Sequence, residues 1–238
     1  MEVKSFTQQI NEGLYDPGIF KAFFLAGGPG SGKTFVASSA FAGSGLKVVN
    51  SDITFEREIK KAGLSMKMPD EEEYFRDILR KRAKGTVLNQ LQTYIKGRLG
   101  LVIDSTGRDY DTIARNANML KQLGYDCYMI FVNTSLDVAL ERQQRRERIV
   151  PEYIVKKNWE GVQSNIGKFQ RLFGMNNFVV VDNNKSEAEL VTITLNNVSK
   201  IVRRLITKPI SSYIAKRWMA GERKAKRRTW KNLKSTWV

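Results

Sequence analysis

Short apolar runs alternate with longer amphipathic segments along most of this chain. Five runs have the length of buried strands, at residues 22–26, 46–50, 100–104, 127–132 and 178–182. The segments between them are long enough for helices, and residues 109–123 carry an apolar stripe at helical spacing. Strands that alternate with helices predict the α/β class, with a five-stranded parallel sheet covered by helices on both faces.

The size of the chain limits its domain organisation. A length of 238 residues with 42% hydrophobic content fits one such core and leaves little room for a second full-sized domain. We assign residues 1–207 to the predicted domain, with its central part at 21–184, and residues 208–238 to a C-terminal tail.

Composition excludes several kinds of chemistry. The chain has no histidine, which excludes histidine bases, Ser-His-Asp triads and the commonest zinc sites. The single cysteine, Cys127, lies in an apolar run and is predicted to be a core residue. No run is long enough to span a membrane and the first residues lack the apolar core of a signal peptide, so we expect a cytoplasmic protein.

The first predicted strand is followed by GGPGSGKT at residues 27–34, which matches G-x-x-x-x-G-K-[ST] at every fixed position. Glycines let the backbone curl around an anion at the start of a helix, where N–H groups and the helix dipole favour negative charge. Lys33 would reach the β and γ phosphates, and the Thr34 hydroxyl would be a ligand of Mg²⁺. The motif predicts a site for ATP or GTP. Its nucleotide-binding residues would be Gly28, Pro29, Gly30, Ser31, Gly32, Lys33 and Thr34.

A carboxylate, Asp52, follows the second predicted strand. Ligands of parallel sheets bind beyond the carboxyl ends of the strands, so Asp52 is expected beside the phosphate loop. There it could take a proton from an acceptor hydroxyl that attacks the γ phosphate. The alternative is that Ser51 or Asp52 only caps the helix that follows.

The third predicted strand ends in a second carboxylate, Asp104, which could hold Mg²⁺ beside Thr34. The alternative, a cap for the next helix, is weakened because Asp109 already suits that position. Thr106 and Arg108 follow, where a hydroxyl and a guanidinium could position an acceptor or a phosphate.

Arginines are dense near residue 145. Arg142, Arg145 and Arg146 share one helical face, and cations that cluster in this way repel one another unless an anion compensates them. We interpret the segment as a lid whose arginines stabilise the transferred phosphoryl group. Because Glu141 and Glu147 flank it, a solvated helix of mixed charge is the alternative.

With these residues assembled, the chain resembles the P-loop kinases that include zeta toxins and the kinase domain of phage polynucleotide 5′-hydroxyl kinase. The resemblance covers about residues 23–184, and it implies a P-loop NTPase fold. It rests on GGPGSGKT, on Asn50-Ser51-Asp52, on the segment IDSTGR at residues 103–108, and on the arginine-rich segment before Ile149-Val150-Pro151.

The resemblance implies a role for each matching residue. Asp52 would be the general base, and the lid would act through Arg142 and through Arg145 or Arg146. The acceptor-binding residues would be Asp104, Thr106 and Arg108, and Asn183 would lie near the adenine. Kinases of this group often carry a second aspartate and a basic residue soon after the base, whereas residues 53–56 here include neither.

The tail carries most of the net charge. Residues 200–238 contain 13 Lys and Arg against one acid, Glu222, so they supply +12 of the formal +16. Cations interleaved with tryptophan and tyrosine are typical of nucleic-acid binding, through counterion release and base stacking. Docking on an anionic membrane and a solvated or folded-back tail are the alternatives.

These features together predict an ATP- and Mg²⁺-dependent kinase that phosphorylates a hydroxyl group, with a nucleic-acid 5′ end as the favoured acceptor. One alternative is a zeta-toxin-like kinase of a small acceptor such as a nucleotide sugar or nucleoside. The other is a nucleic-acid-binding NTPase or assembly factor without kinase activity, in which Asp52 is purely structural.

Overall fold

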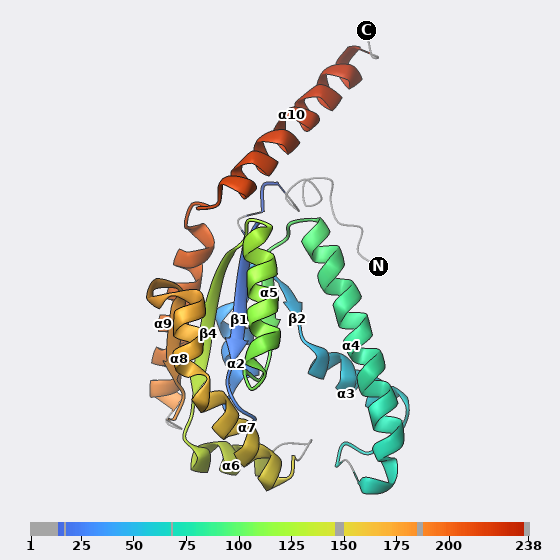
Figure 1. The fold of residues 1–238 in the computed structure, drawn as a ribbon, viewed down its shortest axis with the longest axis vertical. Coiled ribbons are helices and arrows are strands. Elements are labelled where there is room, and N and C mark those ends of the chain that lie inside the picture. The colour runs from blue at the N-terminus through green and yellow to red at the C-terminus, as the bar shows by residue number, and fades with distance from the viewer. Residues whose placement is uncertain (1–13, 17, 68, 146–149, 185–187, 236–238) are drawn as a thin grey trace.

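A five-stranded parallel sheet forms the centre of the molecule in a computed structural model, which describes residues 14–16, 18–67, 69–145, 150–184 and 188–235 (Figure 1). The strands lie in the order β2-β3-β1-β4-β5. They are β1 (Lys21–Ala26), β2 (Lys47–Val49), β3 (Leu101–Asp104), β4 (Asp126–Asn133) and β5 (Phe178–Asp182). All five predicted strands are confirmed, with shifts of one residue at some ends.

Helices cover both faces of this sheet. One face carries α2 (Lys33–Ala40) and α9 (Ala188–Thr207). The other is packed against parts of α4 (Glu73–Lys96), α5 (Tyr110–Gln122), α7 (Glu152–Ser164) and α8 (Ile166–Phe173). The remaining α-helices in the described part of the chain are α3 (Ser51–Lys61), α6 (Leu136–Gln144) and α10 (Tyr213–Ser235). Short 3-10 turns, η1 (Asp70–Glu72) and η2 (Met175–Asn177), precede α4 and β5.

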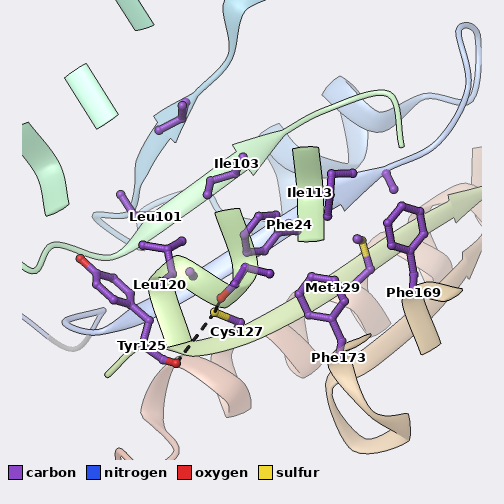
Figure 2. Packing of buried hydrophobic residues seen from close by; sticks show 14 of the residues in the cluster. Phe24, Leu101, Ile103, Ile113, Leu120, Tyr125, Cys127, Met129, Phe169 and Phe173 are labelled. Atoms are coloured by element: carbon purple, nitrogen blue, oxygen red, sulfur yellow. Dashed lines mark hydrogen bonds between the residues drawn. The ribbon is translucent and has the colours of Figure 1, made fainter. Parts of the chain in front are cut away.

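The α5 face of the sheet holds the largest of three apolar clusters among the described residues, part of which Figure 2 shows. Alternate strand residues such as Phe24 and Met129 meet the apolar stripe of α5, which explains why that stripe has helical spacing. Cys127 lies among them, and its thiol donates weakly to the Ala117 carbonyl oxygen at 3.8 Å. Burial raises the pKa of this thiol to about 12, so the prediction that Cys127 is a core residue is confirmed.

Helix α4 is one continuous helix. It runs from Glu73 to Lys96 directly after the η1 turn. Gly85 lies within it, in open space, and does not interrupt it. The helix continues because Ala83, Val87 and Leu91 are buried at spacings of four. Ala83 also packs with Phe55 of α3 in a small separate cluster.

The tail is more ordered than expected. The segment assigned to the tail contains a helix, α10, whose first turns pack on the body. Ala215 is fully buried, and the Trp218 ring meets Phe20 edge-to-face at 5.4 Å. Phe20 precedes β1 at the amino edge of the sheet, so α10 leaves the body at the end opposite α6 and α7 (Figure 1).

A buried charge fixes the start of α10. The Lys21 side chain is 1% exposed, and its Nζ donates to Asp126 Oδ2 at 2.8 Å and to the Lys208 carbonyl oxygen at 2.7 Å. The Ser211 hydroxyl donates to the other carboxylate oxygen of Asp126 at 2.5 Å. The junction between α9 and α10 is therefore bonded to the first residues of β1 and β4. Among the described residues, no helix is long and apolar enough to cross a membrane.

Candidate active site

Loops from four strands meet at the carboxyl edge of the sheet. The Gly27 N–H, directly after β1, donates to the Thr106 carbonyl oxygen in the loop after β3 at 3.1 Å. The Ser31 carbonyl oxygen accepts from Thr134 Oγ1 after β4, at 3.3 Å, and from Asn183 Nδ2 after β5, at 2.7 Å. The predicted phosphate loop thus lies at the centre of this edge.

The backbone of the loop requires glycine at two positions. Gly30 and Gly32 have positive φ values of 77° and 84°. A Cβ would also lie 2.2 Å from the Ala139 carbonyl oxygen at Gly30 and 2.3 Å from Asn183 Nδ2 at Gly32. Close packing against α6 and the β5 loop therefore explains the two glycines.

The loop leads into a helix start that favours anions. Helix α2 begins at Lys33, and among the described residues no side chain caps it and no acid lies in its first turn. Lys33 Nζ donates to the carbonyl oxygens of Gly27 and Gly28, at 2.6 and 3.4 Å. The ammonium therefore lies over the loop. Thr34 is the next residue and is exposed, as a ligand to an incoming ion would need to be.

Asp104 is the half-buried carboxylate of the site. Its Oδ2 accepts from Asn50 Nδ2 at 2.6 Å, while its Oδ1 is buried without a hydrogen-bond partner among the described residues. Burial raises the pKa of Asp104, the charge of Lys33 opposes that rise, and the charge of Asp52 adds to it. The three charged side chains are therefore close enough to interact.

The unpartnered oxygen of Asp104 and the exposed Thr34 hydroxyl fit a hard cation such as Mg²⁺. Within the described ranges, no group of three His, Cys, Asp or Glu side chains could hold a metal without help. Mg²⁺ in such sites is commonly bound by one or two protein oxygens together with substrate phosphates. The donor set therefore suits an ion that arrives with a nucleotide.

Asp104→Asn is expected to stabilise the ligand-free protein at neutral pH. A carboxyl group whose pKa is raised by folding stabilises the fold below its unfolded pKa, and that contribution is lost as pH rises through the folded pKa. The amide avoids this loss, so its Tm should exceed that of wild type at pH 7 and approach it at pH 4. Scanning calorimetry at both pH values measures the shift, where about 1 kcal/mol corresponds to 2–4 °C. A lower Tm at pH 7 would contradict this assignment.

Asp52 is not the cap of α3. Asn50 caps it, because Asn50 Oδ1 accepts from the N–H groups of Asp52 and Ile53 at 2.8 and 3.3 Å. The Asp52 side chain is 46% exposed, and one of its oxygens lies 4.0 Å from Nη2 of Arg80. The alternative in which Ser51 or Asp52 only caps the helix is therefore excluded.

The sequence analysis did not identify two residues of this part of the site. Asn50 joins the α3 cap to Asp104, and an asparagine directly before a helix is a known cap signal. Arg80 of α4 lies over the Phe55 ring at 4.4 Å and brings a cation beside Asp52, where the sequence near Asp52 supplied none. No local signal could have identified Arg80, because it lies 28 residues away.

The predicted lid arginines differ in their surroundings. Arg142 Nη1 donates to the Asn183 carbonyl oxygen at 2.8 Å and lies 3.9 Å from the position of a Cβ on Gly32. Arg145 is 75% exposed on its side chain and pairs with Glu141, as in the mixed-charge alternative. Arg146 lies outside the described residues. The structure therefore places Arg142 at the phosphate loop, and a catalytic role for Arg145 stays a prediction.

The other predicted residues surround the loop. Asn183 is buried, and its side-chain amide donates to the Ser31 carbonyl oxygen of the phosphate loop. Its contact with adenine stays a prediction. Thr106 is exposed beside the loop. Arg108 is also exposed, and its Nη1 donates to Asn158 Oδ1 of α7 at 2.9 Å.

Comparison with known proteins agrees with this geometry. Residues 23–168 match the family AAA_33, described as an AAA domain. Among curated proteins, none matches the sequence of this chain.

Solved structures resemble the fold at low sequence identity. A protein of Chloroflexus aurantiacus J-10-fl described as a kinase has a TM-score of 0.55 and 19% identity, over 77% of this chain and 97% of that one. The structure of AvrRxo1-ORF1:AvrRxo1-ORF2 with sulphate ions has a TM-score of 0.51 and 15% identity, over 90% of this chain and 86% of that one. A gluconokinase from Sinorhizobium meliloti 1021 has a TM-score of 0.47 and 16% identity, over 79% of this chain and 96% of that one. The sheet order, the phosphate loop, the family match and the likeness to the Chloroflexus aurantiacus structure together show the fold of P-loop kinases.

Proposed function

We propose that this chain, which belongs to the AAA_33 family of AAA domains, is a kinase that uses ATP and Mg²⁺ to phosphorylate a hydroxyl group. The observation that carries the proposal is the group at the carboxyl edge. Asn50 links the two carboxylates, because its Oδ1 accepts from the Asp52 N–H and its Nδ2 donates to Asp104. The charge of Asp52 raises the pKa of Asp104 and the charge of Lys33 lowers it. Asp52 is not needed as the cap of α3, because Asn50 already supplies that cap.

Each residue then has a chemical task. Asp52 accepts the proton of the acceptor hydroxyl while the hydroxyl oxygen forms a bond to the γ phosphorus. The bond between the γ phosphorus and the β–γ bridging oxygen breaks, which releases ADP. Lys33 and the loop N–H groups hold the β and γ phosphates, and Arg142 stabilises negative charge on the transferred group. Thr34 and Asp104 would hold Mg²⁺, which when bound neutralises phosphate charge.

We favour a nucleic-acid 5′-hydroxyl end as the acceptor, and with it membership of the zeta toxin and polynucleotide kinase group that the sequence resembles. Support comes from the basic helix α10, on which six exposed cations lie between residues 216 and 227 with one acid. Ala215, Trp218 and Met219 of its first turns pack on the body, whereas Tyr213 and Ile214 are exposed. The six exposed cations outnumber these two exposed apolar side chains, which favours nucleic acid over an anionic membrane as the partner of the tail.

A kinase of a small acceptor, such as a nucleotide sugar or nucleoside, is the second candidate. The position of α10 favours this candidate. Helix α10 begins beside Phe20 at the amino edge of the sheet, whereas the phosphate loop starts at Gly27 on the carboxyl edge. The six residues of β1 put about 20 Å between these points. Nucleic acid held by α10 would have to cross that length of the body to reach Asp52.

Transfer of labelled γ phosphate tests the proposal. Wild type and Lys33→Ala would be incubated with ATP, Mg²⁺ and a panel of 5′-hydroxyl DNA and RNA, nucleosides and nucleotide sugars. Label on an oligonucleotide, lost in the variant, is the expected result. Label on a small acceptor would support the second candidate. ATP binding without label on any acceptor would contradict the kinase and favour a nucleic-acid-binding NTPase.

Changing Arg223, Lys224 and Arg227 together to glutamine is expected to weaken binding of single-stranded DNA. Each lost phosphate contact lowers the slope of log K against log salt by about 0.7, so the slope should fall by about 2. Fluorescence anisotropy over a salt series measures it. The control removes the same charge from exposed positions of α4, at Lys81, Lys84 and Lys96. An equal loss in the control would show that α10 has no special part in binding.

A further inference from the structure

Helix α7 contacts the phosphate loop and the loop after β4. Trp159 Nε1 donates to the Thr134 carbonyl oxygen at 2.7 Å, and the Trp159 backbone lies so close to Gly28 that a Cβ there would be 3.6 Å from Trp159 Cα. One turn later, Gln163 Nε2 donates to Asn133 Oδ1 at 3.0 Å. The position of α7 is therefore fixed relative to the nucleotide side of the site.

The same helix also holds Arg108, in the loop after β3. Asn158 accepts from the guanidinium at 2.9 Å, and the aliphatic part of Arg108 lies on Gly161, where a Cβ would be 2.8 Å from Cγ. At the end of α7, the buried Asn165 donates through Nδ2 to the carbonyl oxygens of Gly107 and Arg108, at 3.2 and 2.9 Å. Backbone, side-chain stem and guanidinium of Arg108 are thus each fixed by α7.

Gly161 is unusual for its place in the helix. A glycine within a helix costs about 0.5–1 kcal/mol relative to alanine, and Gly161 has no positive φ that would require it. What it provides is space, because the Arg108 stem occupies the place of a side chain. Asn158 and Gly161 are three residues apart and so lie on one face of the helix.

We propose that Asn158 and Gly161 are positioning residues that direct the Arg108 guanidinium toward the acceptor. The inference rests on the proposed function, since it takes Arg108 as an acceptor-binding residue. Because α7 also contacts Gly28 and Thr134, one helix sets the acceptor arginine relative to the phosphate loop. The rate of transfer between two bound groups depends on their relative positions, and a misplacement of about 1 Å can lower that rate about 100-fold.

Gly161→Ala separates this role from a structural one. The new methyl group must displace the Arg108 side chain, so KM for the acceptor should rise about tenfold. The Kd for ATP should not change, and Tm should stay close to wild type, because the gain in helix propensity offsets the cost of moving the Arg108 stem. Gly85→Ala is the matched control, since it makes the same change inside α4 in open space. It should keep KM at the wild-type value.

Asn158 gives a second, independent variant. Asn158→Ala removes the acceptor for the guanidinium and should raise KM by a similar factor, whereas Asn158→Asp keeps an oxygen there and should restore it. The probes are a 5′-hydroxyl oligodeoxynucleotide and a nucleotide sugar, with labelled ATP, and calorimetry gives the Kd for ATP. Arg108→Ala is the reference for complete loss of the guanidinium.

The outcomes distinguish the inference from the function on which it rests. If Arg108→Ala raises KM while Gly161→Ala and Asn158→Ala match wild type, the inference is wrong and the kinase stands. If Arg108→Ala leaves KM unchanged, Arg108 does not bind the acceptor, and the inference fails with that assignment. If wild type labels neither probe nor any other acceptor of the panel, the proposed function fails and takes the inference with it.

Discussion

Asp52→Asn is expected to lower kcat for phosphoryl transfer by about 10²- to 10⁴-fold, the usual contribution of a general base. Because the Asp52 carboxylate is half exposed and the cap of α3 comes from Asn50, the amide should fit without loss of stability. The Kd for ATP should stay close to wild type. Steady-state kinetics with the labelled acceptor, together with calorimetric ATP binding, measures both.

Asp137→Asn is the matched control for that substitution. Asp137 is the second residue of α6 and follows the cap Ser135, as Asp52 is the second residue of α3 and follows the cap Asn50. The control therefore makes the same chemical change at the same helical position, away from Asp104. It should leave kcat at the wild-type value. Equal kcat in wild type and Asp52→Asn would exclude Asp52 as the base.

Arg142→Ala is expected to lower kcat by about 10³-fold or more, whereas Arg145→Ala should change it by less than about threefold. Arginines that stabilise the transferred phosphoryl group contribute about 10³ to 10⁵ in rate. Arg142 lies against Gly32 and bonds to the β5 loop, while Arg145 pairs with Glu141 in solvent, where such pairs contribute little.

Single-turnover kinetics at saturating ATP would measure the chemical step for both arginine variants. Thermal unfolding of Arg142→Ala provides the control, because loss of its bond to the Asn183 carbonyl oxygen also removes a structural contact. A variant with wild-type Tm and a slow chemical step would support the assignment. An equal loss of rate in Arg145→Ala would instead show that both arginines act on the phosphates, as the lid interpretation of the sequence has it.

The features that the sequence predicted well are those with a local pattern. The five strands are short apolar runs, and the phosphate loop combines glycines, a lysine and a threonine at fixed spacing, so both can be recognised from neighbouring residues. The positions of Asp52 and Asp104 followed from the same logic, because the carboxyl ends of parallel strands meet at one edge.

What the sequence did not predict depends on packing between distant segments. The contact of Arg80 with Asp52 follows from the packing of α4 on α3, and the support of Arg108 follows from the approach of α7 to the β3 loop. The continuity of α4 past Gly85 likewise depends on the burial of Ala83, Val87 and Leu91 against other segments. Tertiary contacts override local preference in each case.

The anchored start of α10 has a consequence for how this protein can be divided. Ser211, Ala215 and Trp218 belong to the tail by sequence, yet they cover Asp126, Gly124 and Phe20 of the body. A cut at residue 208 would take away Ser211, which donates to Asp126, together with the basic surface of α10, so a lost activity would have two explanations. The first turns of the basic helix pack on the body, so charge on α10 has to be removed by substitution, with the chain left whole.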